Sequence, residues 1–251
     1  MRRTLIKNCI QALLMLALLL LVWGVAYHAT GNELLIPSPL ESLKEMGALF
    51  ADGGFWVALL GTLGRVLAAF LLSLVLAFIL AVAAYVLPAL GGFLSPVVSV
   101  LRTLPALAVV LIILDLCGAS IAPVFVAFLS LFPMLYTGIF AALLQVDTEL
   151  IEMSDVYQVP LGKRVKQLYL PLAMPYVVRE AGAAISFALK LVVSAEVLSL
   201  TLKGVGGLML VSKGDLAIST LFALVGVVVL LGLVFELLFD VLARTMERRW
   251  K

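Results

Sequence analysis

Residues 56–87, WVALLGTLGRVLAAFLLSLVLAFILAVAAYVL, form one apolar run in which Arg65 is the single charged residue. An α-helix needs about 20 apolar residues to cross the roughly 30 Å hydrocarbon core of a bilayer, so this run predicts a membrane-spanning helix. Five further apolar runs are bounded by polar, proline or glycine-containing segments. The sequence therefore predicts an all-α polytopic membrane protein, a single domain over residues 1–251, with spans at about 10–28, 56–87, 95–114, 121–144, 173–200 and 216–245.

The composition excludes most soluble classes of protein. Hydrophobic residues make up 64% of the 251 residues and charged residues 13%, with a mean hydropathy of +1.23. In soluble domains about 45–50% of the residues are hydrophobic and about 25% are charged. Six helices leave little chain for a soluble catalytic domain, and a net charge of +2 gives no basic surface for nucleic acid. Cys9, Cys117 and His28 are too few for a metal cluster or a disulfide framework, so no metal or other cofactor is predicted.

The distribution of basic residues predicts the orientation. With six spans both termini lie on one side, and ten of the 17 Lys and Arg residues fall on that side against three on the other. Cytoplasmic segments carry the excess of Lys and Arg. We therefore expect both termini and the segment 145–169 in the cytoplasm, with 31–54 and 201–215 outside.

Two outward segments have distinct patterns. Residues 40–50 are amphipathic and are expected to lie on the membrane surface. The Gly-rich stretch 204–207 permits tight turns, either as a loop that folds toward a docked partner or as a plain turn. Trp23 and Trp250 are interpreted as interfacial anchors in contact with membrane lipids.

The cytoplasmic segment 147–171, DTELIEMSDVYQVPLGKRVKQLYLP, carries the strongest functional signal. A short amphipathic helix at about 148–160, too short to cross the membrane, is suited to lie in a groove on a soluble partner. The alternative is a solvated loop. The candidate contacts are apolar anchors and acidic residues on this helix: Leu150, Ile151, Met153, Val156 and Tyr157, with Glu149, Glu152 and Asp155.

This segment resembles the EAA loop of ATP-binding-cassette (ABC) importer permeases, through Glu152-Met153-Ser154 at its acidic start and Leu170-Pro171 with Pro175 at its end. Other stretches resemble the nitrate/sulfonate/taurine branch of that family. Each is short, but they occur in the family's order over almost the whole chain: LLIPSPLESL (34–43), TLGRVLAAF (62–70), LRTLPALAVV (101–110), SAEVL (194–198), GVGGLM (204–209) and MERRW (246–250).

The resemblance implies the type I ABC importer permease fold in a bacterial inner membrane. It implies that the short helix couples to a cytoplasmic ATPase, that an external binding protein delivers the solute, and that two permease copies form the inward pathway as a homodimer. The solute implied is small and of the sulfonate, nitrate or taurine type.

The sequence departs from the family at four places. Gln158 stands where the EAA loop usually has its Gly, although Gly162 can supply the turn a few residues later. Asp155 replaces a residue that is commonly small or basic. The stretch 114–118, LDLCG, and Lys190 replace residues that are usually uncharged, so they are candidates for setting substrate identity.

No phosphate-binding loop is present in the sequence. Gly204, Gly206 and Gly207 are followed by LMLVSKG, which lacks the GxxxxGK[ST] spacing. The chain is therefore predicted to be a non-catalytic subunit, with ATP hydrolysis in a separate protein. The main alternative is a secondary transporter or channel driven by an ion gradient, but the two halves of the chain show no evident repeat.

Six charged residues within the predicted spans or at their ends form three candidate pairs. Arg65 with Glu196 and Arg102 with Glu180 lie at compatible depths, and Asp115 with Lys190 is a looser third pair. Charged residues in a bilayer are expected to pair, to face water or to serve function. Each pair is interpreted either as an ion pair between helices or as part of the pathway. Lys190 is the candidate for attracting an anionic solute.

Overall fold

The computed structural model describes the backbone of residues 2–146 and 148–249, and the side chains of residues 14–15, 17–146 and 149–246. All regular elements in this part of the chain are helical. They are α1 (Arg2–Thr30), α2 (Pro39–Ala51), α3 (Gly53–Val86), α4 (Pro88–Thr103), α5 (Ala106–Cys117), α6 (Ala122–Leu144), α7 (Thr148–Val156), α8 (Leu161–Arg164), the π-helical turn η1 (Val165–Tyr169), α9 (Leu170–Leu198), α10 (Val205–Gly214) and α11 (Ile218–Arg249). The side chains of Cys9 and Trp250 lie outside the described residues.

Four helical stretches in the described residues are long and apolar enough to cross a membrane: Gly53–Val86, Ala122–Leu144, Leu161–Leu198 and Ile218–Met246. Counting α4 and α5 as one bent span gives five. The predicted first span, 10–28, falls within α1, where the apolar part among the described residues, Ala17–Thr30, is shorter. The fold is thus all-α, with four or five candidate membrane spans among the described residues, and the predicted number of six stays a prediction.

The predicted span 95–114 is divided in the structure. α4 begins earlier, at Pro88, and α5 leaves it at an angle of 93°. Pro105 lies in the break and has no N–H to continue the helix, while Leu104 before it is extended, with φ −67° and ψ 124°. A residue before proline is driven out of the helical region, which explains the position of the bend. Pro133 and Pro175, by contrast, lie inside α6 and α9.

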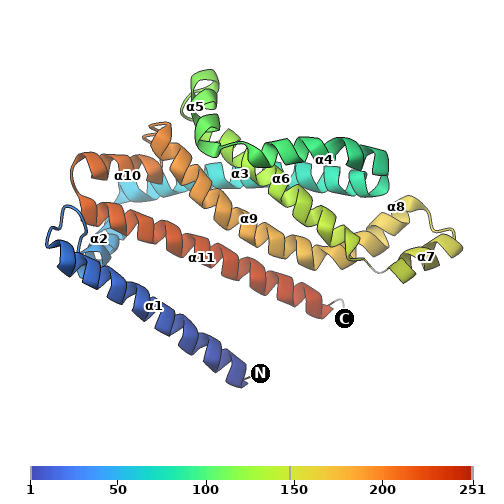
Figure 1. Ribbon diagram of the computed structural model, residues 1–251, viewed down its shortest axis with the longest axis horizontal. Helices are drawn as coiled ribbons and strands as arrows, with labels where there is room; N and C mark the ends of the chain where they lie inside the picture. Colours follow the sequence, from blue (N-terminus) through green and yellow to red (C-terminus); the bar gives the residue numbers. More distant parts are fainter. Residues whose placement is uncertain (1, 147, 250–251) are drawn as a thin grey trace.

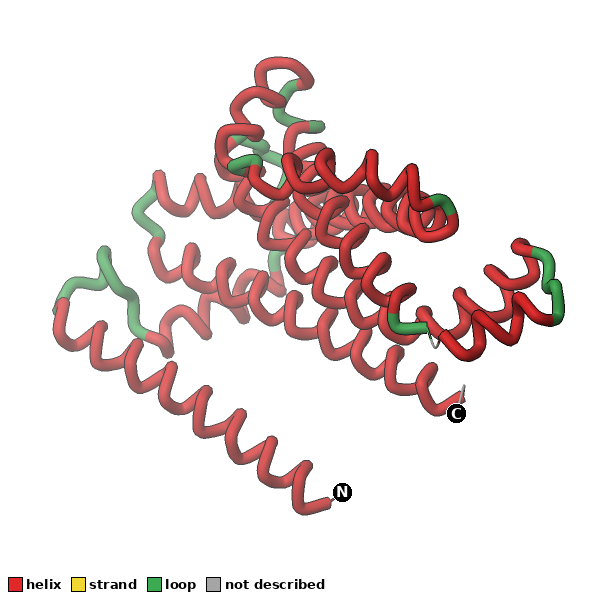
Figure 2. Tube along the Cα trace, turned by 45° about the vertical axis from the view of Figure 1, so that its right-hand side comes forward, coloured by secondary structure: helices red, strands yellow, loops and turns green. Residues whose placement is uncertain are grey.

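The core lies where α3, α6 and α9 pack together, with α11 along α9 (Figure 1). α3 contributes Ala69, Ala77 and Ala81, all without solvent exposure, and such small residues let membrane helices approach closely. α1 lies apart from this bundle, and α5 projects from it (Figure 2).

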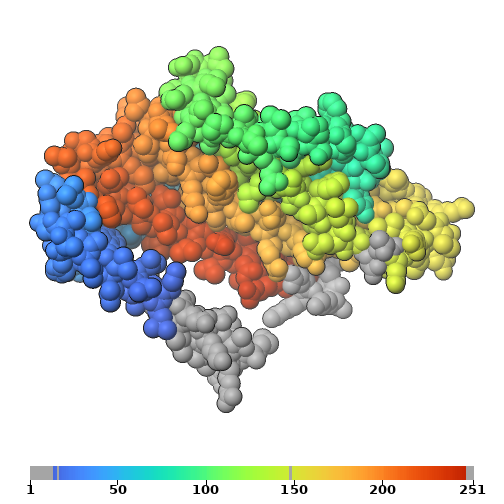
Figure 3. Space-filling model, viewed as in Figure 1, coloured from blue at the N-terminus to red at the C-terminus, as the bar shows by residue number. Residues whose placement is uncertain are grey.

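The connecting elements gather at two ends of the bundle. α7, α8 and the end of α11 lie toward one end, whereas α2 and α10 lie toward the other (Figures 1 and 3). α2 covers the expected amphipathic segment, and the Ser38 hydroxyl caps it by accepting from the Glu41 N–H at 3.1 Å. α10 replaces the loop expected at 201–215, for a reason that lies in its hydrogen bonds.

Candidate functional site

A helical hairpin of α7 and α8 projects from one end of the bundle (Figure 1). The chain turns at Gln158, where φ is +50°. The Val159 N–H donates to the Ser154 carbonyl and the Gln158 N–H to the Asp155 carbonyl, both at 3.0 Å, which is the Schellman pattern of a helix end. Gly162, expected as the turn residue, lies inside α8 instead. Gln158 itself therefore occupies the left-handed position that favours glycine.

An ion pair joins the two arms of this hairpin. Arg164 of α8 donates to the Asp155 carboxylate of α7 at 2.5 Å, and the Arg164 side chain is only 15% exposed. Asp155, expected to contact a partner, is thus engaged within its own chain.

The α7 helix has two faces. Ile151 packs against the core of the bundle, Ser154 is buried and Leu150 is half-buried. The opposite face is exposed, with Val156 at 79% and Tyr157 at 76%. Four exposed residues follow one another at helical spacing on this face, and we call them the α7 stripe: Glu152, Met153, Val156 and Tyr157. The predicted contact residues therefore fall into two groups, because Ile151 packs against the bundle and Leu150 is half-buried, whereas the stripe is exposed. Glu149 and Gln158 are exposed beside the stripe.

A buried polar cluster lies at the opposite end of the bundle. The Glu196 side chain of α9 has no solvent exposure, and Arg65 of α3 donates to it at 2.8 Å. The Thr62 hydroxyl donates to the same carboxylate at 2.9 Å and accepts from the Val205 N–H at 2.8 Å. The Gly206 N–H donates to Glu196 Oε2 at 3.0 Å. This Glu196 cluster (Thr62, Arg65, Glu196 and the Val205 and Gly206 amides) ties α3, α9 and α10 together.

The cluster explains why residues 204–207 begin a helix. Glu196 and Thr62 accept hydrogen bonds from amides at the α10 N-terminus, which the helix cannot satisfy itself. A Cβ at Gly206 would lie 2.5 Å from Glu196 Cβ, so a larger residue has no room there. No role for Thr62 was predicted from the sequence. Thr62 lies one helical turn before Arg65, so its position on the same face of α3 could have indicated that it also contacts Glu196.

The Arg102–Glu180 and Asp115–Lys190 pairs do not form within the chain. Arg102 and Glu180 line one cavity, but neither has a polar partner among the described residues. Asp115 and Lys190 are both exposed, with no ion pair between them in the described structure. Lys190 lines none of the described cavities.

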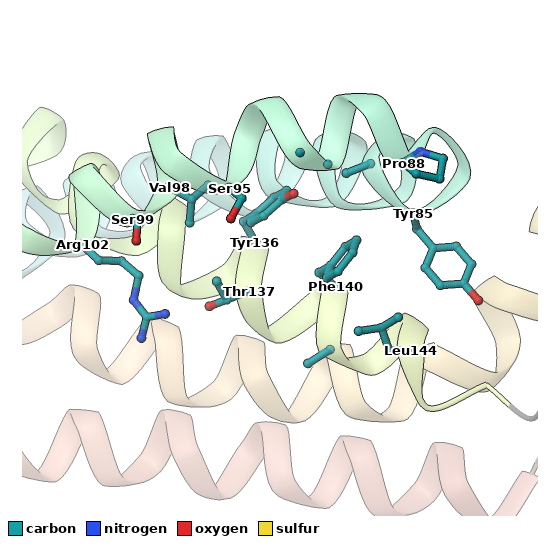
Figure 4. Close-up of a pocket in the computed structure, with 14 residues that line it drawn as sticks. Tyr85, Pro88, Ser95, Val98, Ser99, Arg102, Tyr136, Thr137, Phe140 and Leu144 are labelled. Carbon is teal, nitrogen blue, oxygen red and sulfur yellow. The ribbon is translucent and has the colours of Figure 1, made fainter.

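Two cavities meet at Arg102 and Thr137. The first, of about 650 Å³, lies between the α3–α4 corner and α6, and the rings of Tyr85, Tyr136 and Phe140 line it (Figure 4). The second, of about 510 Å³, continues from Arg102 to Glu180 of α9. Together they make a groove that runs from the α3–α4 corner, where Tyr85 and Pro88 lie, to the middle of α9.

Comparison with known proteins decides the family. Residues 73–250 match the family of binding-protein-dependent transport system inner membrane components. The chain belongs to this family. The α7 stripe and both cavities lie within the matched residues 73–250 of this inner membrane component. Thr62 and Arg65 precede the matched residues. The match is to the family as a whole, and the nitrate/sulfonate/taurine branch stays a prediction.

Relatives of this inner membrane component support the assignment. The glycine betaine/proline betaine transport system permease protein ProW of Escherichia coli (strain K12) is 26% identical over 242 residues, which cover 92% of this chain. The chain spans 64% of the length of that relative.

Two solved structures share the fold. The MetNI methionine ABC transporter in inward-facing conformations matches with a TM-score of 0.64 at 18% identity, covering 76% of this chain and 96% of that one. An amino acid ABC transporter with histidines matches with a TM-score of 0.58 at 18% identity, covering 83% and 97%.

Proposed function

We propose that this chain is the membrane-spanning subunit of an ATP-driven importer, and that the α7 stripe docks it onto a cytoplasmic ATPase. The observation that carries the proposal is the α7–α8 hairpin. Its ion pair and its buried face fix its position, while Met153, Val156 and Tyr157 are left exposed at the end of the bundle. Apolar residues presented in this way beside a carboxylate suit a groove on a soluble partner.

The same proposal assigns the remaining partners. Two copies of the chain form the inward pathway as a homodimer, because one bundle leaves the groove at Arg102 open on one side. An external binding protein delivers the solute at the end where α2 and α10 lie. Both chain termini and the α7–α8 hairpin are then in the cytoplasm, and the subunit sits among lipids in a bacterial inner membrane.

The proposal also covers the class of solute. The branch that the sequence resembles points to a small solute of the sulfonate, nitrate or taurine type, whereas the relative ProW is a glycine betaine/proline betaine permease. We propose a small polar solute. Attraction of an anion by Lys190 has no support in the structure, because Lys190 lies outside the described cavities.

The test is a variant of the α7 stripe that leaves every span unchanged. Glu152→Lys combined with Tyr157→Ala reverses one charge and removes the aromatic ring of the stripe. We expect normal membrane insertion, with loss of ATPase co-purification from native membranes and of ATP-driven uptake. Asp215→Lys, an exposed charge reversal after α10 at the opposite end, is the control for ATPase co-purification.

Retention of a stoichiometric ATPase and of parental uptake by the double variant would contradict the proposal. A secondary transporter or channel, the alternative, takes up solute along an ion gradient without any co-purifying ATPase.

A further inference from the structure

A smaller cavity, of about 180 Å³, lies where α1, α2 and α11 meet. The exposed side chains of Leu20, Leu43 and Val225 line its mouth. Ser42 and Ala223, which are 2% and 0% exposed, line its floor. Because α11 is a candidate membrane span, we expect the mouth to open to the hydrocarbon of the bilayer.

The Ser42 hydroxyl is a buried polar group that has no hydrogen-bond partner among the described residues. Hydroxyls inside other helices of this chain donate to a carbonyl one turn earlier, as Ser73 does to Ala69 at 2.7 Å and Thr137 to Pro133 at 2.9 Å. Ser42 makes no such bond. A buried donor without an acceptor is costly, so an occupant that brings an acceptor oxygen to Ser42 is favoured.

The rest of the wall offers an occupant little else to hydrogen-bond. The Trp23 indole N–H already donates to the Pro37 carbonyl at 3.1 Å, and its ring packs against Phe222 with centroids 5.5 Å apart. The other lining side chains are apolar, or absent at a glycine: Leu20, Pro39, Leu43, Met46, Phe222, Ala223, Val225 and Gly226. Ser42 is therefore the one side chain of the wall with an unused donor.

This combination selects among occupants. A buried water needs two to four polar partners, and a single hydroxyl does not supply them from the side chains. A purely apolar occupant leaves the Ser42 hydroxyl unpaired. An acyl chain that ends in an ester carbonyl matches both features, because the chain fills an apolar slot and the carbonyl oxygen accepts one hydrogen bond.

A glycine keeps the floor of the cavity open. A Cβ added to Gly226 of α11 would lie 2.7 Å from the terminal methyl carbon of Met46, its one neighbour within 4 Å outside the adjoining backbone. A larger side chain at position 226 would therefore push Met46 or occupy the cavity itself. Gly232, on the same helix, has nothing within 4 Å of an added Cβ and does not line the cavity.

We propose that this cavity holds one acyl chain of a membrane phospholipid, whose ester carbonyl accepts a hydrogen bond from the Ser42 hydroxyl. The bound chain packs against Trp23 and Phe222 and so holds α1 to α11. α1 otherwise lies apart from the bundle (Figure 2), so the lipid supplies contacts that the chain itself lacks there. This lipid site is independent of the proposed coupling to an ATPase.

Two phospholipids that differ at one group test the proposal. The purified permease is stripped of lipid in detergent and offered an equal mixture of a diacyl phosphatidylglycerol and its dialkyl ether analogue, which has no ester carbonyl. Native mass spectrometry counts the molecules of each that stay bound per chain. We expect one bound lipid per chain, with the ester retained about three- to tenfold over the ether.

Variants separate the hydrogen bond from the space. Ser42→Ala should abolish the preference for the ester while the cavity still takes either lipid. A hydroxyl with a merely structural role would leave that preference unchanged. Gly226→Leu should lose the bound lipid, whereas Gly232→Leu, which adds the same side chain outside the cavity, should retain it.

Three outcomes would overturn the proposal: a parental permease that retains no more lipid than Gly226→Leu, one that retains ester and ether equally, or a Ser42→Ala variant that keeps the preference. Lipid held non-specifically at the apolar surface gives the second outcome. The comparison of ester with ether uses the parental protein, so it decides the matter even where a variant fails to fold.

Discussion

Glu196 is a fully buried carboxylate whose partners come from α3 and from the α10 N-terminus. Glu196→Ala leaves the Gly206 N–H without its acceptor and the Arg65 guanidinium with only the Lys203 carbonyl. We expect it to cost about 3–5 kcal/mol, as for other broken buried pairs. Glu196→Gln keeps an acceptor oxygen and should cost less. Thermal unfolding of the purified permease measures both, and an unchanged midpoint for Glu196→Ala would show that the cluster does not stabilise the fold.

Two glycines of α10 form a matched comparison. A Cβ at Gly206 would lie 2.5 Å from Glu196 Cβ and 2.7 Å from the Val193 carbonyl oxygen, whereas a Cβ at Gly214 meets nothing within 4 Å. Gly206→Ala is therefore expected to destabilise the permease by about 1–3 kcal/mol through overpacking. Gly214→Ala should be neutral or slightly stabilising. Equal unfolding midpoints for the two variants would contradict the close packing.

Gln158 adopts a backbone conformation that costs a residue with a side chain about 1–2 kcal/mol. Gln158→Gly should relieve this cost, with a net gain of about 0.5–1 kcal/mol after the higher entropy of unfolded glycine. Gln158→Val should have the opposite effect. Hydrogen exchange of the 154–159 amides is the measurement, and faster exchange in the glycine variant would refute a left-handed turn at this position.

The α5 helix leaves the bundle at 93° and exposes Leu107, Leu111 and Leu116. We expect it to pack against the second copy in the proposed homodimer. Cys117 at its end is exposed, so in a Cys9→Ser background a bifunctional maleimide should link two chains through Cys117. Val229→Cys with Cys117→Ser places the thiol on the exposed face of α11 as the control. Equal dimer yields from both positions would contradict an interface at α5.

The elements that sequence alone could predict are those fixed by local pattern. The run 56–87 corresponds to α3 at Gly53–Val86, and 121–144 to α6 at Ala122–Leu144, because length and hydropathy suffice for such helices. α10 was expected as a loop. Sequence alone could not predict this helix, because its start depends on hydrogen bonds to Glu196 and Thr62, which are distant in sequence. The bend between α4 and α5 falls within residues 95–114, which were expected to form one span.

The site was predictable to a similar extent. Matched depths placed Arg65 with Glu196 and brought Arg102 and Glu180 to the same region. Depth does not determine which way a side chain points around its helix. It therefore gave no warning that Arg102 and Glu180 stay unpaired, or that Ile151 turns toward the bundle.

The charge asymmetry predicts the orientation of the whole molecule in the membrane. α8, with Lys163, lies at one end of the bundle, and α10, with Lys213, at the other (Figure 1). In a cysteine-free background, we expect an impermeant thiol reagent added outside intact cells to label Lys213→Cys and not Lys163→Cys. Labelling of Lys163→Cys alone would mean that the termini and the hairpin face outward.

We propose that the exposed face of α7 contacts an ATPase. Photo-crosslinking from single positions tests this contact, with benzoylphenylalanine placed at Tyr157, which is 76% exposed, or at Ser154, which is 7% exposed on the other face. We predict that position 157 crosslinks to a cytoplasmic ATPase in native membranes and that position 154 does not. A crosslink from position 157 only to lipid or to the same protein, with the ATPase present, would contradict a contact between α7 and the ATPase.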